Sequence, residues 1–161
     1  MNEIKVLMVC LGNICRSPMA DGLLRKKVKE NNLPVFVDSA GTGGWHVGEA
    51  PDERMRATAK RFDVPIDELR GRQFSRTDFD QFDWIYVMDH SNRDNVLQLA
   101  RNSEDKEKVE LILNESMPDS DAEVPDPYFG GEQGFTAVFK LLDDATDAII
   151  EKLKKELNGK G

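Results

Sequence analysis

Four short, mainly apolar runs of residues interrupt an otherwise polar chain and predict buried β-strands. Apolar runs of this length, partly β-branched and bounded by turn residues, are typical of strands that are covered on both faces of a parallel sheet. The predicted strands are residues 6–9, 35–37, 84–88 and 109–113.

The segments between and after these runs show the apolar spacing or the charge distribution of helices that lie on a sheet. The predicted helices are residues 18–31, 51–62 and 134–157, and a further helix runs through Arg101. Ser17 is expected to be the N-cap of the first helix, and Ser91 that of the helix ending near Arg101. Alternating strands and helices predict an α/β fold, a three-layer doubly wound sandwich with a four-stranded parallel sheet, in a single domain spanning residues 1–161.

Composition and charge narrow the possible classes of function. A net charge of −8 argues against nucleic acid and anionic membranes as partners. Because apolar runs stay well short of a membrane span, neither a transmembrane helix nor a secretory signal is expected, and the predicted location is cytoplasmic. The two cysteines are close together and the two histidines lie far from them, so there is no zinc-binding pattern. We therefore expect no metal and no cofactor.

The first predicted strand ends at Cys10, and the residues after it form a candidate anion-binding loop. Gly12 and Asn13 tolerate left-handed backbone angles, which lets successive N–H groups converge on one point. The next helix directs its N-terminus to the same point, and Arg16 offers two parallel donors to phosphate oxygens. In these surroundings Cys10 is expected to be a thiolate and a nucleophile directed at phosphorus. The alternative is that Cys10 is a small apolar residue at a strand end and that Arg16 is a surface residue. In that case this rare combination of features would be a coincidence.

A second candidate for chemistry lies in the loop 114–132, which contains six acidic residues and no Lys or Arg. Loops of this length inside a domain are usually functional, and this one leaves the same edge of the predicted sheet as Cys10. Within the loop Asp126 lies between two prolines, which restrict its motion. A carboxyl group held in this way, with aromatic residues next to it, suits an acid that protonates a phenolic leaving group.

Four further residues are interpreted from their positions in the chain. Trp45 lies in a glycine-rich loop and is predicted to form a wall of a cleft, with capping of the core as the alternative. Asp89 ends the third predicted strand, where parallel sheets place their sites, and is expected to brace loops rather than to catalyse. His46 and His90 belong to no partnered motif and are interpreted as surface or packing residues.

The segment C-L-G-N-I-C-R-S-P at residues 10–18 resembles the signature of the low-molecular-weight protein tyrosine phosphatases. The resemblance extends over nearly the whole chain, because further segments follow in the order and spacing of that family. These segments are D-S-A-G-T at 38–42, W-H-V-G at 45–48, R-Q at 72–73, V-M-D-H-S-N at 87–92 and D-P-Y-F-G at 126–130. The resemblance implies the strand order 2-1-3-4 and the hydrolysis of phosphotyrosine, an aryl phosphate monoester, through a cysteinyl-phosphate intermediate. It implies tyrosine-phosphorylated proteins or peptides as partners, and inorganic phosphate as product and inhibitor.

The resemblance also implies a role for individual residues. The catalytic residues are Cys10 as nucleophile, Arg16 and, as general acid, Asp126. The phosphate-binding residues are Leu11, Gly12, Asn13, Ile14, Cys15, Arg16 and Ser17. The walls of the substrate cleft are Leu11, Ile14, Trp45, Tyr128 and Phe129. The residues that support the phosphate-binding loop from behind are Asn13, Ser17, Ser39 and Asp89.

Alternatives to this function differ in residues that the sequence lets us inspect. Phosphoarginine phosphatases are close relatives, but members with that activity tend to have Thr at the position of Ile14. Arsenate reductases of the thioredoxin-coupled type share the fold and the loop, but they use additional cysteines, and none follows Cys15. A non-catalytic phosphate-binding module could lack the nucleophile or the acid, and both are present here. The chain departs from the family at Leu69, where a histidine commonly joins the hydrogen bonds behind the loop.

Cys15 has no chemical step in the implied mechanism. One interpretation is that it is a small apolar filler beneath the loop. The other is that it captures oxidised Cys10 in a reversible disulfide before irreversible oxidation, which would make the enzyme redox-sensitive.

Overall fold

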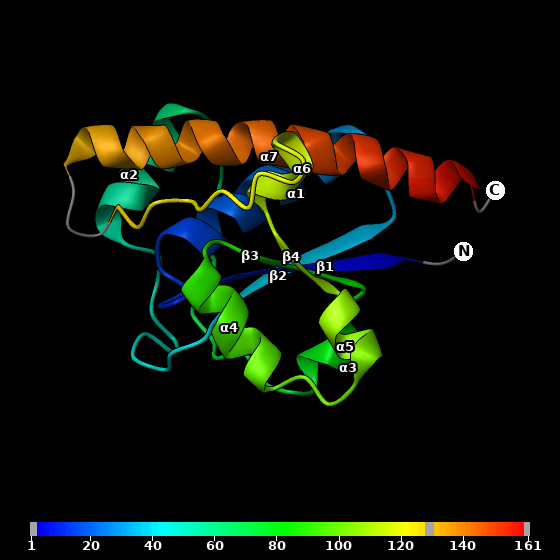
Figure 1. Ribbon diagram of the computed structural model, residues 1–161. Coiled ribbons are helices and arrows are strands. Elements are labelled where there is room, and N and C mark those ends of the chain that lie inside the picture. The colour runs from blue at the N-terminus through cyan, green and yellow to red at the C-terminus, as the bar shows by residue number, and fades with distance from the viewer. Residues whose placement is uncertain (1–2, 128–130, 160–161) are drawn as a thin grey trace.

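The computed structural model describes residues 3–127 and 131–159 and is organised around one four-stranded sheet (Figure 1). The strands are β1 (Ile4–Cys10), β2 (Val35–Gly41), β3 (Trp84–Val87) and β4 (Val109–Leu111). All neighbouring strands are parallel, and their order is β2-β1-β3-β4. The predicted α/β architecture and the implied strand order are both confirmed.

Helices cover both faces of the sheet and give the three layers that were predicted (Figure 1). One face carries α1 (Arg16–Glu30), α2 (Glu53–Arg61), α6 (Leu113–Ser116) and α7 (Glu132–Gly159). The other carries α3 (Asp78–Gln81), α4 (His90–Gln98) and α5 (Ser103–Glu107). Within the described part of the chain, no helix has the length and apolar content that crossing a membrane requires.

The side chains of β1 alternate between two hydrophobic cores. Val6 and Met8 belong to the larger core beneath α1 and α7, whereas Leu7 and Val9 belong to the smaller core on the opposite face. All four side chains are fully buried. Burial on both faces explains why the predicted strand is apolar without interruption.

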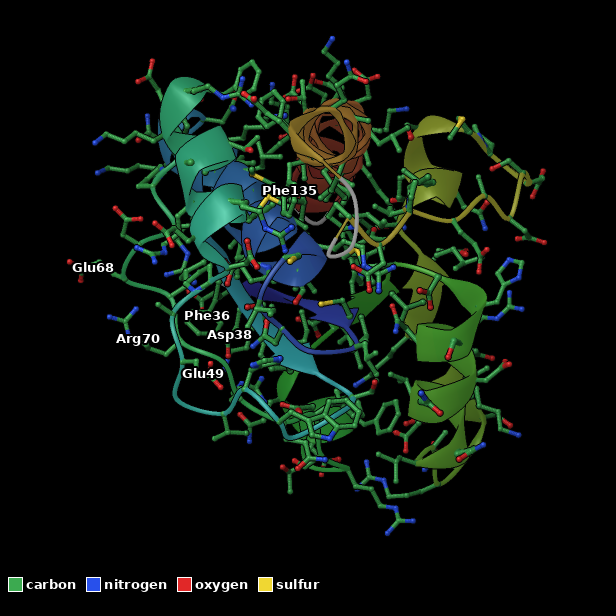
Figure 2. All side chains as sticks on the ribbon, turned by 90° about the vertical axis from the view of Figure 1, so that its left-hand side faces the viewer. Phe36, Asp38, Glu49, Glu68, Arg70 and Phe135 are labelled. Carbon is green, nitrogen blue, oxygen red and sulfur yellow. The ribbon has the colours of Figure 1, made fainter. Side chains whose placement is uncertain are left out.

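The long helix α7 closes the larger core by packing along α1 and α2. Phe135, near its start, is fully buried and lies between α7 and α2, where the guanidinium of Arg54 covers its ring at 4.7 Å from the centroid (Figure 2). Farther along, the ammonium of Lys27 in α1 donates to the carbonyl and carboxylate of Asp143 and to the hydroxyl of Thr146, each at 2.8 Å. One lysine therefore joins α1 to α7 through three hydrogen bonds.

The prediction that Ser17 caps α1 is wrong. The helix begins at Arg16, and Cys15 occupies the cap position without a side-chain hydrogen bond to the helix. The physical reason is that the loop before the helix winds tightly into its first turn and the hydroxyl of Ser17 bonds to loop side chains instead. Pro18 consequently lies within the first turn, where a missing N–H costs nothing.

The prediction that Ser91 caps the following helix is also wrong. The cap lies two residues earlier, at Asp89, and α4 begins at His90, because the carboxylate of Asp89 accepts the N–H of Asn92 at 2.7 Å. Aspartate is as good an N-cap as serine, and Asp89 lies directly before the first helical residue.

Other element boundaries differ from the prediction by small amounts. The strand predicted at 109–113 ends at Leu111, and α6 then occupies the start of the predicted loop 114–132. The short helices α3, α5 and α6 contain only four or five residues each and were not predicted. Too few turns are present in such segments for an apolar period to emerge.

The carboxyl ends of the strands bring the site loops together at one edge of the sheet. Gly41, the last residue of β2, makes this approach possible, because a Cβ atom there would lie 2.8 Å from the carbonyl oxygen of Leu11 and 3.1 Å from the nitrogen of Asn13. The next residue, Thr42, donates its N–H to the carbonyl of Cys10 at 2.9 Å. The loop after β1 is thus pressed against the end of β2.

Candidate active site

The loop between β1 and α1 closes around the sulfur of Cys10. Asn13 has a φ of 58°, in the left-handed region that its identity predicted, and its backbone N–H donates to the sulfur at 3.3 Å. Gly12 is not left-handed; its missing side chain instead makes room for the ring of His46, which would lie 3.1 Å from a Cβ atom. The loop therefore presents an N–H group and the positive end of α1 beside the thiol.

Ser17 connects Cys10 to Asn13 beneath the loop. Its buried hydroxyl oxygen lies 3.0 Å from the sulfur of Cys10 and donates to Oδ1 of Asn13 at 2.7 Å. A single hydroxyl proton can serve only one of these partners at a time. While Cys10 is a thiol, its own proton can bond to the Ser17 oxygen; once Cys10 is ionised, the sulfur can only accept, and the proton of Ser17 can turn towards it.

The amide nitrogen Nδ2 of Asn13 is buried and has no hydrogen-bond partner among the described residues. Leu69, at the position where the resembled family commonly has a histidine, is partly buried against the larger core and has no polar side-chain atom. If the amide of Asn13 were turned over, Nδ2 would donate to Ser17 and Ser17 to the sulfur. The ionised form of Cys10 can thus recruit a donor that is otherwise unsatisfied.

Arg16 is held rigidly, with an exposed fraction of only 3%. Its Nη1 atom donates to Oδ2 of Asp89 at 2.7 Å and to the carbonyl oxygen of Val124 at 2.9 Å. Burial lowers the pKa of Arg16, but the charge of Cys10 and the bond to Asp89 outweigh it, so the pKa lies above its ordinary value. Asp89 thereby joins three segments: α1, the start of α4 and, through Arg16, the loop 114–132.

Asp126 faces the same site from the loop 114–132, which we call the acidic loop. Its Oδ2 atom lies 4.0 Å from Nη2 of Arg16, and its side chain is 45% exposed. Asp126 and Cys10 line one cavity although more than one hundred residues separate them in the sequence. A carboxyl group at this place can exchange its proton with a molecule bound above the sulfur.

The cavity has a volume of about 230 Å³. Of the residues that the resemblance places on the cleft wall, all that the structure describes line this cavity. Leu11, Ile14 and Trp45 line it together with Cys10 and Arg16. The side chain of Trp45 is 69% exposed, so the alternative that it caps the core is wrong. Tyr128 and Phe129 lie outside the described residues.

His46 also lines the cavity, although it was interpreted as a surface or packing residue. Its Nδ1 atom lies 3.0 Å from a carboxylate oxygen of Glu49, which is labelled in Figure 2. The loop that carries both residues is fixed by Gly71, which accepts the N–H of Gly48 and donates to the carbonyl of Glu49, each at 2.8 Å. The one signal in the sequence was that His46 follows Trp45, since neighbours on a cleft loop can both reach the cleft.

Cys15 lies in the same loop as Cys10, is buried and also lines the cavity. Burial raises the pKa of its thiol well above the ordinary value, and the negative charges of Asp52, Cys10 and Asp126 raise it further. The two cysteines therefore have different surroundings. Both are free thiols in this structure.

Ser39 lies on β2 beside Met8 of β1 and close to Asp21, a buried residue of α1. Burial raises the pKa of Asp21 to about 6, although Arg25 and Ser39 favour the ionised form. Arg25 donates two hydrogen bonds to the same carboxylate oxygen, at 2.9 and 3.1 Å. Ser39 thus contacts the helix behind the loop, and its support of the loop itself stays a prediction.

One cluster of acidic side chains occurs in the described residues outside this site. It consists of Asp143, Asp144 and Asp147 on α7. The ammonium of Lys27 already lies 2.8 Å from a carboxylate oxygen of Asp143 and 2.8 Å from one of Asp147. A lysine therefore supplies the positive charge for these carboxylates.

Comparisons with known proteins agree on one family. A sequence model described as low molecular weight phosphotyrosine protein phosphatase matches residues 5–159. A Synechocystis protein assigned to the same family is 41% identical over 156 residues, which is 96% of this chain and 99% of that protein. The crystal structure of a protein tyrosine phosphatase from Entamoeba histolytica, with Hepes in its active site, is similar with a TM-score of 0.88 and 37% identity, covering 95% of this chain and 98% of that one. The structure of a Drosophila arginine phosphatase has a TM-score of 0.86 and 34% identity, covering 94% of this chain and 98% of that one.

Proposed function

This chain belongs to the low molecular weight phosphotyrosine protein phosphatase family, and from this premise we propose how its residues share the reaction. The protein is a protein tyrosine phosphatase that hydrolyses aryl phosphate monoesters. In the proposed first step the sulfur of Cys10 attacks phosphorus in line with the leaving phenol. Arg16 and the backbone N–H groups of residues 11–17 bind the equatorial oxygens, and Asp126 protonates the departing phenolate.

The second step hydrolyses the cysteinyl phosphate formed in the first. Asp126, now ionised, removes a proton from the attacking water, and the S–P bond breaks to release inorganic phosphate. The hydroxyl of Ser17 donates to the sulfur as its negative charge returns. Its distance of 3.0 Å from the sulfur supports this role.

A single observation carries this assignment. Cys10 and Arg16, at the two ends of the loop between β1 and α1, line one cavity with Asp126 of the distant loop 114–132, and the arginine and the aspartate approach within 4.0 Å. Nucleophile, oxyanion donors and proton donor are the three components that a phosphoryl transfer of this kind requires. Leu11, Ile14 and Trp45 add apolar walls, which suit an aromatic substrate.

The decisive experiment compares aryl phosphates whose leaving phenols differ in acidity, with EDTA present throughout. Wild type should turn over both a phosphotyrosine peptide and a nitrophenyl phosphate without added metal. Asp126→Asn should lose roughly 100-fold or more in kcat/KM with the phosphotyrosine peptide and far less with the nitrophenyl ester, whose phenolate leaves unprotonated. Equal losses with both substrates would show that Asp126 is structural.

Phosphoarginine is the second substrate to test, because a Drosophila arginine phosphatase is among the similar structures. Ile14, at 9% exposure, places an apolar side chain in the cavity wall where relatives with that activity tend to have Thr. We expect a higher kcat/KM for the phosphotyrosine peptide than for phosphoarginine. Arsenate should not be reduced, because the relay would need a further cysteine.

We further infer that the physiological partners are tyrosine-phosphorylated proteins, with phosphate as product and competitive inhibitor, and not nucleic acid or membranes. We assign residues 1–161 to one phosphatase domain, with its sheet as the common core. A catalytic thiol functions in a reducing compartment, which supports a cytoplasmic location. Fractionation of cells with detection of the protein in the membrane or exported fractions would contradict this location.

We also propose that Cys15 protects Cys10 from irreversible oxidation. Peroxide would convert the thiolate of Cys10 to a sulfenic acid, with cleavage of the O–O bond and release of hydroxide. The sulfur of Cys15 would then attack that of Cys10 and displace hydroxide, forming a disulfide that a dithiol reduces back to two thiols. The shared loop and shared cavity of the two cysteines support this proposal.

A further inference from the structure

The position of Asp126 depends on how the acidic loop is attached to the end of β3. In Figure 1 this loop is the yellow trace that leaves α6 and runs towards the start of α7. Val124, two residues before Asp126, donates its N–H to the carbonyl of Met88 at 2.8 Å and accepts Nη1 of Arg16 at 2.9 Å. Pro125 and Pro127 limit the backbone freedom on both sides of Asp126. Whatever fixes residues 121–124 therefore also fixes the carboxyl group.

His90, the first residue of α4, holds the part of the loop just upstream. Its ring atom Nε2 lies 2.8 Å from the carbonyl oxygen of Asp121, and its backbone N–H donates to a carboxylate oxygen of Glu123 at 2.9 Å. A carbonyl oxygen only accepts, so Nε2 carries the proton in this bond. The other ring nitrogen, Nδ1, faces the same Glu123 carboxylate at 3.8 Å.

The segment that His90 contacts has little else to hold it in place. Asp119 and Asp121 have φ values of 60° and 51°, in the left-handed region that costs free energy for residues other than glycine. Residues 119–121 are exposed. Asn114 bonds to the N–H and the carboxylate of Asp121 at 2.8 and 3.0 Å, and Ser120 donates its N–H to the carbonyl of Met117 at 3.2 Å. A strained and exposed turn keeps its shape only where contacts of this kind over-determine it.

We propose that His90 is a positioning residue for proton transfer by Asp126. His90 is not among the residues that line the cavity; it acts through the carbonyl of Asp121 and the backbone to Val124. The proposal rests on the assignment of Asp126 as the general acid. It gives a function to a residue that the sequence pattern left on the surface.

The test measures kcat/KM over a series of aryl phosphates whose leaving phenols have pKa values from about 7 to about 10, the upper value being that of tyrosine. Loss of the His90 ring should leave phosphate binding intact but move the acid away from the leaving oxygen. For His90→Ala we expect a loss of about 5- to 20-fold with the least acidic phenols, a fraction of the full general-acid effect, and less than about 2-fold with the most acidic. The dependence of rate on leaving-group pKa should therefore become steeper, partway towards that of Asp126→Asn.

Three further variants separate positioning from a general effect on the fold. His90→Gln retains an N–H donor that can reach the carbonyl of Asp121, so it should recover most of the lost rate. His90→Phe retains a ring of similar shape without a donor and should behave like His90→Ala. Ser91→Ala changes an exposed neighbour on the same helix and should match wild type in every assay. Inhibition by inorganic phosphate should be the same in wild type, in the three His90 variants and in Ser91→Ala.

The outcomes distinguish this proposal from the assignment on which it rests. Equal losses over the whole substrate series, no loss in either His90→Ala or His90→Phe, or no recovery in His90→Gln would overturn the role of His90. If the loss in kcat/KM that Asp126→Asn causes is the same for all leaving phenols, the assignment of Asp126 as the general acid fails, whatever the His90 variants do.

Discussion

The anion site and the nucleophile can be separated at the level of single atoms. The sulfur of Cys10 accepts one N–H of the loop, whereas Arg16 is oriented by Asp89 and Val124 without help from the sulfur. We therefore expect Cys10→Ser to lose all measurable turnover while it still binds phosphate or vanadate within about 10-fold of wild type. Isothermal titration with both anions checks this expectation.

Arg16→Lys is the matched comparison for that experiment. An ammonium keeps the charge but cannot bind two oxygens at once or keep both protein contacts of the guanidinium. It should weaken binding of the anion as well as turnover. Residual catalysis by Cys10→Ser would remove Cys10 as the nucleophile, and near-normal activity of Arg16→Lys would show that the paired donors are unimportant.

The proposed protective role of Cys15 carries a dependence on pH. Burial and the charge of Asp52 raise the pKa of its thiol, so little thiolate is present near neutrality to attack oxidised Cys10. The fraction of activity that dithiothreitol restores after a fixed peroxide dose should rise between about pH 6 and pH 8, as the thiolate fraction grows. Cys15→Ser should recover little at any pH. Equal recovery of variant and wild type would leave Cys15 with a packing role alone.

At the level of elements, the end of β2 limits how the phosphate-binding loop can be arranged. A methyl group on Gly41 would lie 2.8 Å from the carbonyl oxygen of Leu11, and backbone cannot move aside as a flexible side chain can. We expect Gly41→Ala to cost roughly 2 kcal/mol or more of unfolding free energy, and to weaken phosphate binding, because the loop must shift. Urea denaturation and phosphate inhibition measure the two effects.

Gly159→Ala provides the control for that substitution. A Cβ atom at this last residue of α7 meets nothing within 4 Å, so stability and inhibition by phosphate should stay close to those of wild type. If Gly41→Ala is equally harmless, the contact between β2 and the loop does not restrict the loop.

The elements that the sequence predicted well are those whose signal is local. Residues 6–9 and 85–88 are buried on both faces of the sheet, so they had to be apolar. The predicted caps at Ser17 and Ser91 were wrong because residue preferences at helix ends do not show which of two possible partners wins. The hydroxyl of Ser17 bonds to loop side chains, and Asp89 caps the helix in place of Ser91. The place of His46 on the cavity wall depended on how its loop folds against Gly71, a contact between distant segments that no pattern encodes.

For the whole molecule, one buried carboxyl group links stability to pH. Burial raises the pKa of Asp21 to about 6 in the folded protein, above its value in the unfolded chain. The folded state therefore binds the proton more tightly, and the stability that this group contributes is full below about pH 4 and is lost as the pH rises through about 6. The difference between these two pKa values corresponds to ~3 kcal/mol.

Replacing Asp21 with Asn removes this titration but keeps an oxygen that Arg25 can bind. We expect Asp21→Asn to be more stable than wild type at pH 7.5 by up to ~3 kcal/mol and to have little or no advantage at pH 4. Asp67→Asn, in an exposed loop, should show no such difference between the two pH values. Denaturant unfolding at several pH values gives the comparison, and a difference that does not change with pH would contradict the raised pKa.

The three bonds from Lys27 to α7 have a consequence for the order in which the protein becomes active during its synthesis. The helix α1, which follows the nucleophile, reaches the solvent early, but the helix that covers it leaves the ribosome after every other described element. Until α7 emerges, the part of α1 that packs against α7 has no cover and is a target for chaperones. Nascent chains stalled before residue 132 should therefore be catalytically silent, so that the cell acquires phosphatase activity only with completed molecules; turnover by such stalled chains would show that α1 is held in place without its cover.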